Sequence, residues 1–399
     1  MNFLLGVGIV KSNPIREKLK YINYKILIPY LILTITGIIM IYSASSELLL
    51  INGFKPSIYG VRQAIYAIVA FILGAMVYFI PIRILRNPKL LACLVTLGTV
   101  LLLFVRFFGQ EVNGARGWIN LGFFNLQPLE LCKLILILYL AHVLDRVDGK
   151  LTVGNIRKNL LYPSVIAAIF MALVLIEPDI GGTAILFLIV LIMYSVSGVP
   201  AGLAITWIVS IILIVVGAFC LLVQWNPSFL SNKYFFKRFV AFLNPFKNAQ
   251  GVGAQLVNSY YAIHNGGLIG VGLGNSMEKR GYLPEPYTDF ILSVISEEVG
   301  SIGAIIILGV LFYLMIQIMQ VGIKADAQYT ALVCFGIVTV LFSETFFNVG
   351  ALLGLLPITG VTLPFISYGG SSILVLTICI AVVLNVSASE SLLKAERAK

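Results

Sequence analysis

Long apolar runs alternate with short polar segments along almost the whole chain. A helix needs about 20 mostly apolar residues to cross the hydrocarbon core of a bilayer. Ten runs approach that length, namely 26–43, 63–81, 89–107, 129–144, 160–176, 180–198, 202–223, 289–319, 328–351 and 371–389. The pattern predicts an all-α integral membrane protein, a bundle of about ten transmembrane helices.

The composition excludes two other classes of protein. Of the 399 residues, 59% are apolar and 11% are charged, and the mean hydropathy is +1.00. Soluble domains carry about 25% charged residues, so a water-soluble protein of this composition would expose aggregating apolar patches. Disordered chains have the opposite composition, with high charge and low apolarity. The main solvent of this chain is therefore lipid.

Cysteine and histidine give no sign of a disulfide framework or a metal site. The five cysteines all lie inside apolar runs, where they are expected to behave as small buried hydrophobic residues. His142 and His264 are too far apart for a metal cluster, so no protein metal site is predicted. The first ten residues lack a basic segment, so a cleaved signal peptide is not expected.

The distribution of lysine and arginine predicts the orientation. Sixteen of them lie in the N-terminal tail, the second, fourth and eighth connections and the C-terminal tail, against four in the short loops opposite. Since cytoplasmic loops carry the excess of positive charge, both termini are expected in the cytoplasm. We expect one membrane domain over 1–399, with cytoplasmic tails at 1–25 and 390–399. Much of the net charge of +10 then reflects topology and not nucleic-acid binding.

One long loop, 224–288, is predicted to be extracellular, and its length is typical of a functional loop. Its segment 233–246 interleaves Lys233, Lys237 and Arg238 with phenylalanines, as in a helix that lies in the membrane interface. Such a helix either anchors the loop or binds the phosphates of a lipid-linked substrate. The glycine-rich stretch 265–276 has no βαβ context and lies outside the cell, so nucleotide binding is rejected.

The end of this loop holds the leading candidate for catalysis. Asp289 follows Glu285 and is the first residue of the eighth apolar run, 289–319. An Asp at this position either caps the helix or is a carboxylate whose pKa an apolar neighbour raises toward the range of a general base. Glu297 and Glu298 lie two turns deeper, where ionisable groups are costly and usually face a cavity or a cation.

Three further groups are candidates for a cavity. Glu130 and Lys133 are three residues apart on one helix, so they share a face and are predicted to pair. Arg116 and Trp118 lie at the outer interface, where Trp is also a common belt residue. The segment 357–372, which contains Ser367 and Tyr368, is uncharged and rich in Pro and Gly. Such backbone at membrane depth is tolerated where it is buried in protein or lines a cavity.

Together these segments resemble the SEDS family (shape, elongation, division and sporulation), the FtsW/RodA/SpoVE membrane glycosyltransferases of bacterial cell-wall synthesis. The matching pieces, in family order, are GARGWINLGFFNLQPLELCK (114–133), EPDIGGTA (177–184), NGGLIGVGLGNSMEKRGYLPEPYTDFILSVISEEVGSIG (265–303) and FNVGALLGLLPITGVTLPFISYGGSS (347–372). The motifs LPEPYTDF and LPFISYGGSS are highly specific. The ten-span count and the long outer loop agree with the family.

The resemblance implies a peptidoglycan glycosyltransferase that polymerises lipid II into glycan strands, with Asp289 as the catalytic residue. The chain departs from the family at Gly117, where relatives often carry Arg or Ser, and at Glu344, where they often carry Gln. The residues expected to bind substrate are Arg116, Trp118, Glu130, Lys133, Lys233, Arg238, Glu285, Glu298, Ser367 and Tyr368. Among the cations, Arg116, Lys133 and then Arg238 are the candidates to stabilise the leaving diphosphate.

The resemblance also implies partners and a location. A class B penicillin-binding protein should supply the transpeptidase, within the divisome or elongasome, because no serine acyl-enzyme motif is present. The segment GLGNSMEKRGYLPEP is closer to the division branch, FtsW. No cofactor is predicted with certainty, and a divalent cation, Mg²⁺ or Mn²⁺, stays open. A lipid II flippase, suited to intramembrane charges, and a non-catalytic scaffold that recruits a wall synthase are the alternative functions.

Overall fold

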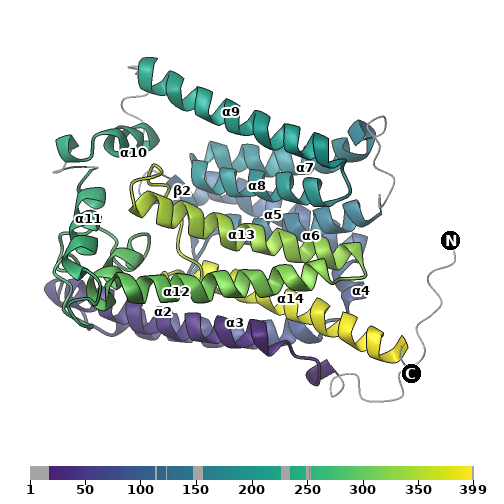
Figure 1. Ribbon diagram of the computed structural model, residues 1–399, viewed down its shortest axis with the longest axis horizontal. Helices are drawn as coiled ribbons and strands as arrows, with labels where there is room; N and C mark the ends of the chain where they lie inside the picture. The colour runs from purple at the N-terminus through teal and green to yellow at the C-terminus, as the bar shows by residue number, and fades with distance from the viewer. Residues whose placement is uncertain are drawn as a thin grey trace.

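The computed structural model describes residues 18–112, 115–122, 124–146, 156–225, 234–248, 251 and 253–397. Ten long helices form one elongated bundle (Figure 1). They are α2 (Tyr24–Ile51), α3 (Ile58–Phe79), α5 (Pro88–Phe108), α6 (Pro128–Asp145), α7 (Ile156–Ile176), α8 (Ile180–Val196), α9 (Ala201–Trp225), α12 (Ile291–Ile323), α13 (Gln328–Leu352) and α14 (Gly370–Arg397). Each of the ten predicted apolar runs coincides with one of these helices.

Seven of these helices are long and apolar enough to cross a membrane: α2, α3, α5, α7, α12, α13 and α14. Among the other three, α8 has only 17 residues. Helix α6 carries Glu130, Lys133 and Asp145, which lower its hydropathy. The protein is thus a multi-pass membrane protein built almost wholly from helices.

Short elements occupy the connections. The all-α prediction missed a small antiparallel sheet in the order β1-β2-β3, formed by β1 (Gln110–Val112), β2 (Ala115–Asn120) and β3 (Asn125–Leu126). Its strands are too short to show an alternating pattern in the sequence. The long loop contains α10 (Tyr234–Leu243), η2 (Phe246–Asn248) and α11 (Ala254–Gly266), and α4 (Ile82–Leu85) joins α3 to α5.

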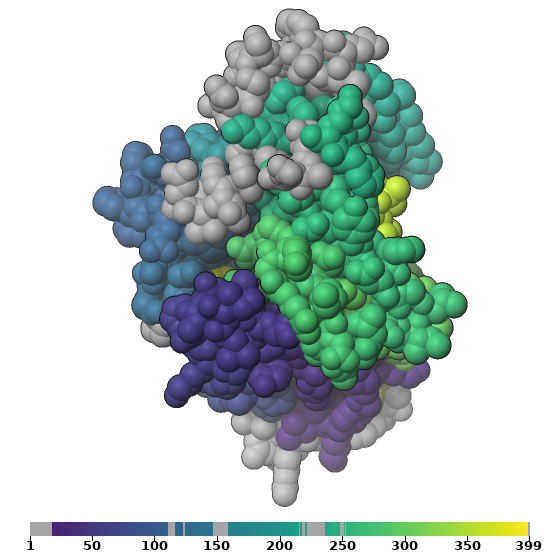
Figure 2. Space-filling model, turned by 90° about the vertical axis from the view of Figure 1, so that its left-hand side faces the viewer, coloured from purple at the N-terminus to yellow at the C-terminus, as the bar shows by residue number. Residues whose placement is uncertain are grey.

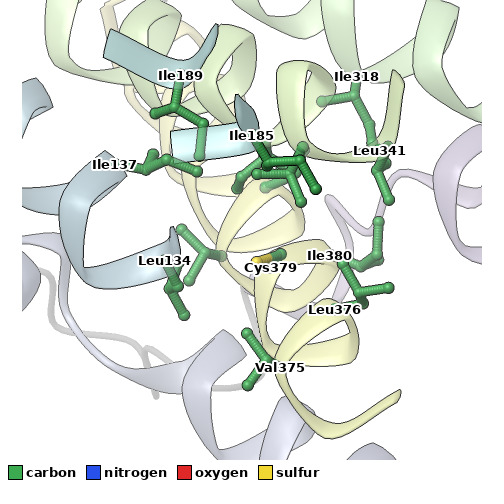
Figure 3. Packing of buried hydrophobic residues seen from close by; sticks show 14 of the residues in the cluster. Leu134, Ile137, Ile185, Ile189, Ile318, Leu341, Val375, Leu376, Cys379 and Ile380 are labelled. Atoms are coloured by element: carbon green, nitrogen blue, oxygen red, sulfur yellow. The ribbon is translucent and has the colours of Figure 1, made fainter. Parts of the chain in front are cut away.

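Helix α14 lies in the middle of the packing. Val375, Leu376, Cys379 and Ile380 project from it toward side chains of α6, α8, α12 and α13 (Figure 3). It also packs along α3. Because α13 and α14 are enclosed by other helices, they carry many of the buried polar residues of the bundle, while the outer helices expose apolar side chains to lipid.

Helix α12 is interrupted at Gly300, whose φ of +80° and ψ of 170° are not helical. The glycine-rich loop fills the break. Val271 N–H donates to the Glu297 carbonyl at 2.9 Å, and Ser301 N–H donates to the Gly267 carbonyl at 3.0 Å. A Cβ atom on Gly300 would lie 2.3 Å from the Leu268 carbonyl oxygen. The glycines therefore permit close approach between the loop and α12.

The large loop and the described C-terminal end lie at opposite ends of the bundle (Figure 1). Lys18, at the start of the described chain, donates to Asn385 in the second half of α14 at 2.6 Å, so the start of the described chain lies against the helix that ends it. At the other end, three surfaces meet: the α2–α3 region (purple), the region of the β-strands (blue) and the long loop before α12 (green) (Figure 2). The candidate site lies at this loop end.

Candidate functional site

Asp289 lies just before α12, at the loop end of the bundle, and its side chain is partly buried. Burial raises the pKa of this carboxyl to about 6, Arg238 opposes the rise and Glu285 adds to it. The backbone around it is fixed, because Asn348 of α13 donates to the carbonyls of Asp289 at 2.8 Å and of Val361 at 2.9 Å. A carboxylate with this pKa is mostly deprotonated near neutral pH and suits a general base.

The capping interpretation of Asp289 is wrong. Helix α12 begins at Ile291, its N-cap residue is Phe290, and no side chain caps it. The carboxylate instead faces Gly360 and Arg238, since a Cβ atom on Gly360 would lie 3.5 Å from Asp289 Oδ2 and 3.3 Å from Arg238 Nη1. Asp289 thus does not cap the helix, and its side chain is available for chemistry.

Arg238 belongs to α10, the helix predicted from the interleaved basic and aromatic residues. It is buried, and its Nη1 donates to the Ile358 carbonyl at 3.3 Å. Phe236 and Phe239 on the same helix are also buried, whereas Lys237 is exposed. The two cations of this helix thus differ, since Lys237 faces outward and Arg238 points into the protein beside Asp289.

The uncharged segment 357–372 closes over the same site, as its composition predicted. Ser367 is buried and donates to the Thr288 carbonyl at 2.7 Å, and Tyr368 N–H donates to the Tyr287 carbonyl at 2.9 Å. These bonds tie the residues that flank Asp289 to this segment. Glu285 has a φ of +54° and its carboxylate accepts a bond from Thr288 Oγ1 at 3.2 Å. Glu285 therefore shapes the turn and also adds negative charge near Asp289.

Glu130 and Lys133 form the predicted ion pair at 2.8 Å between Oε1 and Nζ. Lys133 also pairs with Glu344 of α13, a partner that spacing along the chain could not reveal. All three side chains are buried, and Glu130 Oε2 and Glu344 Oε2 lack a hydrogen-bond partner within the described part of the protein. With two carboxylates around it, Lys133 is less suited than Arg238 to bind a diphosphate.

Glu298 lies elsewhere in the loop end and has its own cation. Its carboxylate pairs with the buried Lys279 at 2.7 Å and accepts a hydrogen bond from Ser43 at 2.6 Å. The neighbouring Glu297 accepts bonds from Ser276 Oγ and from Met277 N–H at 3.0 Å. This arrangement favours a structural role for both glutamates, in which they hold the segment before Asp289 against α2 and α12. Binding of substrate by Glu298 stays a prediction.

The remaining predicted residues are spread around the site. Arg116 is exposed and Trp118 is partly buried, both on β2. Lys233 lies outside the described residues. Within the described chain, no group of three or more His, Cys, Asp or Glu side chains could hold a metal ion. Mg²⁺ is often held by one or two carboxylates together with substrate phosphates, so a requirement for Mg²⁺ or Mn²⁺ stays a prediction.

Two carboxylates of the EPDIGGTA segment were not singled out by the sequence. Asp179 caps α8 through a bond from Gly182 N–H at 2.7 Å, and burial raises its pKa. Burial and Asp179 raise the pKa of Glu177 to about 8, and Arg106 opposes the rise. Glu177 Oε2 lies 4.0 Å from where a Cβ atom on Gly117 would be. An acidic residue directly before an apolar run was the available signal for Asp179.

Comparisons with known proteins identify similar chains. The family model for FtsW, RodA and SpoVE, described as a cell cycle protein, matches residues 24–392. The chain is 39% identical to a probable peptidoglycan glycosyltransferase FtsW of Lactococcus lactis, with 94% of each chain covered. It is 38% identical to a protein of the same description from Enterococcus hirae, again over 94% of each chain.

Solved structures show the same fold. A chain from a peptidoglycan synthase complex that coordinates polymerization and crosslinking superposes with a TM-score of 0.74 at 24% identity, over 92% of this chain and 98% of that chain. The rod shape determining protein RodA of Thermus thermophilus gives 0.66 at 24% identity, over 92% of this chain and 97% of that chain. At these identities the likeness establishes the arrangement of the helices.

Proposed function

Because the chain belongs to the FtsW, RodA and SpoVE family of cell cycle proteins, we propose that it is a peptidoglycan glycosyltransferase. It polymerises lipid II into glycan strands at the outer face of the plasma membrane. The observation that carries the proposal is the position of Asp289, a partly buried carboxylate with a pKa of about 6, beside Arg238 and beneath the segment 357–372. Relatives described as FtsW favour a role in division.

Asp289 acts as the general base. It accepts the proton of the 4-hydroxyl of the acceptor GlcNAc while that oxygen bonds to C1 of the donor MurNAc. The bond between C1 and the diphosphate oxygen breaks at the same centre, and undecaprenyl diphosphate leaves with the electron pair. The fixed backbone carbonyls of residues 287–289 keep the carboxylate in place, so that little reorganisation is needed when the proton moves.

Arg238 supports both halves of this reaction. Its positive charge keeps part of the Asp289 population deprotonated, and its guanidinium is suited to a phosphate oxygen of the leaving group. Arg116, exposed on β2, is a second cation for the diphosphate. The lipid tails stay in the bilayer and the sugars extend into the loop end, which accounts for a sugar polymerase embedded in the membrane.

The orientation and the partner follow from the same proposal. The termini lie in the cytoplasm, and the loop end of the bundle faces outward, where lipid II presents its sugars. A class B penicillin-binding protein supplies the crosslinking activity. A partner of this kind is supported by the structural likeness to a chain from a peptidoglycan synthase complex in which polymerization and crosslinking are coordinated.

The test is glycan formation from lipid II by purified protein, with the partner present and any glycosyltransferase of its own inactivated. Asp289→Asn should fold and insert normally, because Asp289 caps no helix. Its rate of glycan formation should fall about 10²–10⁴-fold, which is the typical contribution of a general base. Asp326→Asn, at an exposed Asp, is the matched control and should retain activity.

The outcomes separate the candidate functions. A stable, inactive Asp289→Asn protein beside an active Asp326→Asn protein supports catalysis. Wild-type protein that moves lipid II across vesicles without polymerising it would instead establish the flippase. Wild-type protein that does neither but still binds the partner would establish the scaffold. An Asp289→Asn protein that polymerises at the wild-type rate would remove the assigned base.

A further inference from the structure

A chain of partly buried aromatic rings runs beside the candidate site, and these rings take no part in the proton transfer or in the departure of the diphosphate. Tyr59 and Tyr66 lie on α3, Tyr287 and Tyr368 lie in the two segments that flank Asp289, and Phe124 precedes β3. Neighbouring centroids are 6.4 Å apart for Phe124 and Tyr66, 6.4 Å for Tyr66 and Tyr368, 4.9 Å for Tyr368 and Tyr59, and 4.7 Å for Tyr59 and Tyr287. These five residues are called the aromatic row.

The aromatic row is continuous with the catalytic segment. Tyr287 is two residues before Asp289, and its carbonyl accepts the bond from Tyr368 N–H at 2.9 Å. Glu285 acts electrostatically on both Tyr287 and Asp289. One end of the row, Tyr287, is therefore fixed next to Asp289. The other end, Phe124, lies between β2 and β3.

The rings are unlike the aromatic residues that face lipid. Phe107 and Phe108 of α5 are 73% and 72% exposed, whereas all five rings of the row are only partly exposed and contact one another. Burial raises the pKa of Tyr287 and of Tyr368, so their hydroxyls stay neutral and remain hydrogen-bond donors. Arg62, an exposed cation on α3, interacts with the Tyr368 hydroxyl.

We propose that the aromatic row is a binding subsite for a β-1,4-linked N-acetylated glycan, and that it holds the strand next to Asp289 between rounds of addition. Pyranose rings present C–H faces that pack on aromatic faces, and their hydroxyls and amides bind phenol groups at the rim. Ring packing of this kind tolerates the alternation of two sugars, since each sugar has an apolar face. The identity of the glycan rests on the proposed function, and the row itself rests on the contacts above.

The first experiment tests binding without catalysis. The probe is N,N′,N″,N‴-tetraacetylchitotetraose, a soluble β-1,4-linked GlcNAc oligomer, added to the detergent-solubilised full chain and measured by titration calorimetry. Tyr59→Leu and Tyr66→Leu should each weaken binding by about tenfold or more, which corresponds to about 1.4 kcal/mol. Tyr66→Phe keeps the ring and should bind within about twofold of wild type. Phe104→Leu, a lipid-facing ring of α5, is the control.

The second experiment measures product length with lipid II as substrate. Tyr66→Leu should shorten the glycan strands several-fold, and the fall in length should exceed the fall in the initial rate, because the strand dissociates sooner. Tyr66→Phe should restore the length. A purely structural row would instead lower the rate and the thermal stability together and leave the lengths of completed strands unchanged.

The two proposals fail in different ways. Binding of the probe that depends on the row, in a protein that makes no glycan, supports the subsite and overturns the polymerase. Wild-type strand lengths and probe affinity in both Tyr→Leu variants would overturn the subsite and leave the polymerase intact. If Tyr59→Leu does not fold, Tyr66→Leu decides, since its neighbours in the row are Phe124 and Tyr368 and not Tyr287.

Discussion

Lys133 of α6 donates a hydrogen bond to Glu344 of α13, a residue 211 positions further along the chain. The same ammonium holds Glu130 at 2.8 Å, so two buried carboxylates share one cation. Truncating one partner of a buried ion pair leaves uncompensated charge, and this costs more than replacing the whole group. The cluster therefore stabilises the α6–α13 contact only as a unit.

The first prediction concerns this unit. Lys133→Met should destabilise the protein by about 3–5 kcal/mol, because both carboxylates lose their cation. Glu130→Gln added to Lys133→Met should recover little, since the buried Glu344 carboxyl is still left without its partner, whereas a further Glu344→Gln should recover most of the loss. Apparent melting temperatures in detergent measure the series. Equal melting temperatures for the double and triple variants would show that Glu344 has no part in the cluster.

The second prediction separates a structural from a substrate-binding Glu298. Glu298→Gln should lower both stability and activity, because Lys279 is then buried without a counter-charge. Adding Lys279→Met should restore much of the melting temperature. If the role of Glu298 is structural, polymerase activity returns with stability. A double variant that is stable but inactive would show that the carboxylate is needed by the substrate.

The sequence predicted the ten helices because each apolar run is long and its ends carry polar residues. The 3.6-residue period also placed Glu130 and Lys133 on one helical face, and their pairing is confirmed. These are local properties of one segment. The strands of the small sheet stayed hidden because the longest of them has only six residues.

The assembly of the site could not be predicted, because it depends on contacts between distant segments. No local pattern places Arg238 of α10 beside Gly360 and Asp289, or Glu344 against Lys133. The basic and aromatic pattern of α10 predicted a helix but could not show that Arg238 is buried. One amino-acid sequence by itself shows which residues are unusual. Only the fold shows which of these residues contact one another.

The third prediction concerns orientation. In a chain with its five native cysteines replaced, of which Cys93 and Cys220 are exposed, a cysteine at Lys247 should react with a membrane-impermeant maleimide in intact cells. A cysteine at Glu396 should react only after the membrane is opened. Both positions are exposed in the structure, so access to the label depends on the side of the membrane. The reverse pattern would contradict the cytoplasmic termini and the outward site.

The fourth prediction tests the spacing between Arg238 and Asp289. Gly360→Ala places a methyl group 3.3 Å from Arg238 Nη1 and 3.5 Å from Asp289 Oδ2, at a φ of +81°. Gly274→Ala meets a similar φ of +85° but has no neighbouring atom within 4 Å. Both variants should lose about 1–2 kcal/mol of stability from the left-handed backbone. Only Gly360→Ala should also lose polymerase rate at matched folded protein, and equal rates would contradict the assigned pair.

The last prediction is the pH dependence of the polymerase. The pKa of Asp289 is raised to about 6 by burial, against the opposing effect of Arg238. A general base works only when deprotonated, so the rate should rise with pH, reach half of its maximum near pH 6 and level off above it.

Variants of the two charged neighbours test whether Asp289 is the group whose titration produces the acidic limb of this pH–rate profile. Arg238→Gln removes the charge that lowers the pKa of Asp289, so the limb should move to higher pH. Glu285→Gln removes the charge that raises it, so the limb should move to lower pH. Opposite shifts, measured as initial rates of glycan formation at saturating lipid II, identify Asp289 as the titrating group, because a group elsewhere would not respond to both neighbours. A limb that neither variant moves would assign the base to another residue, even if Asp289→Asn is inactive.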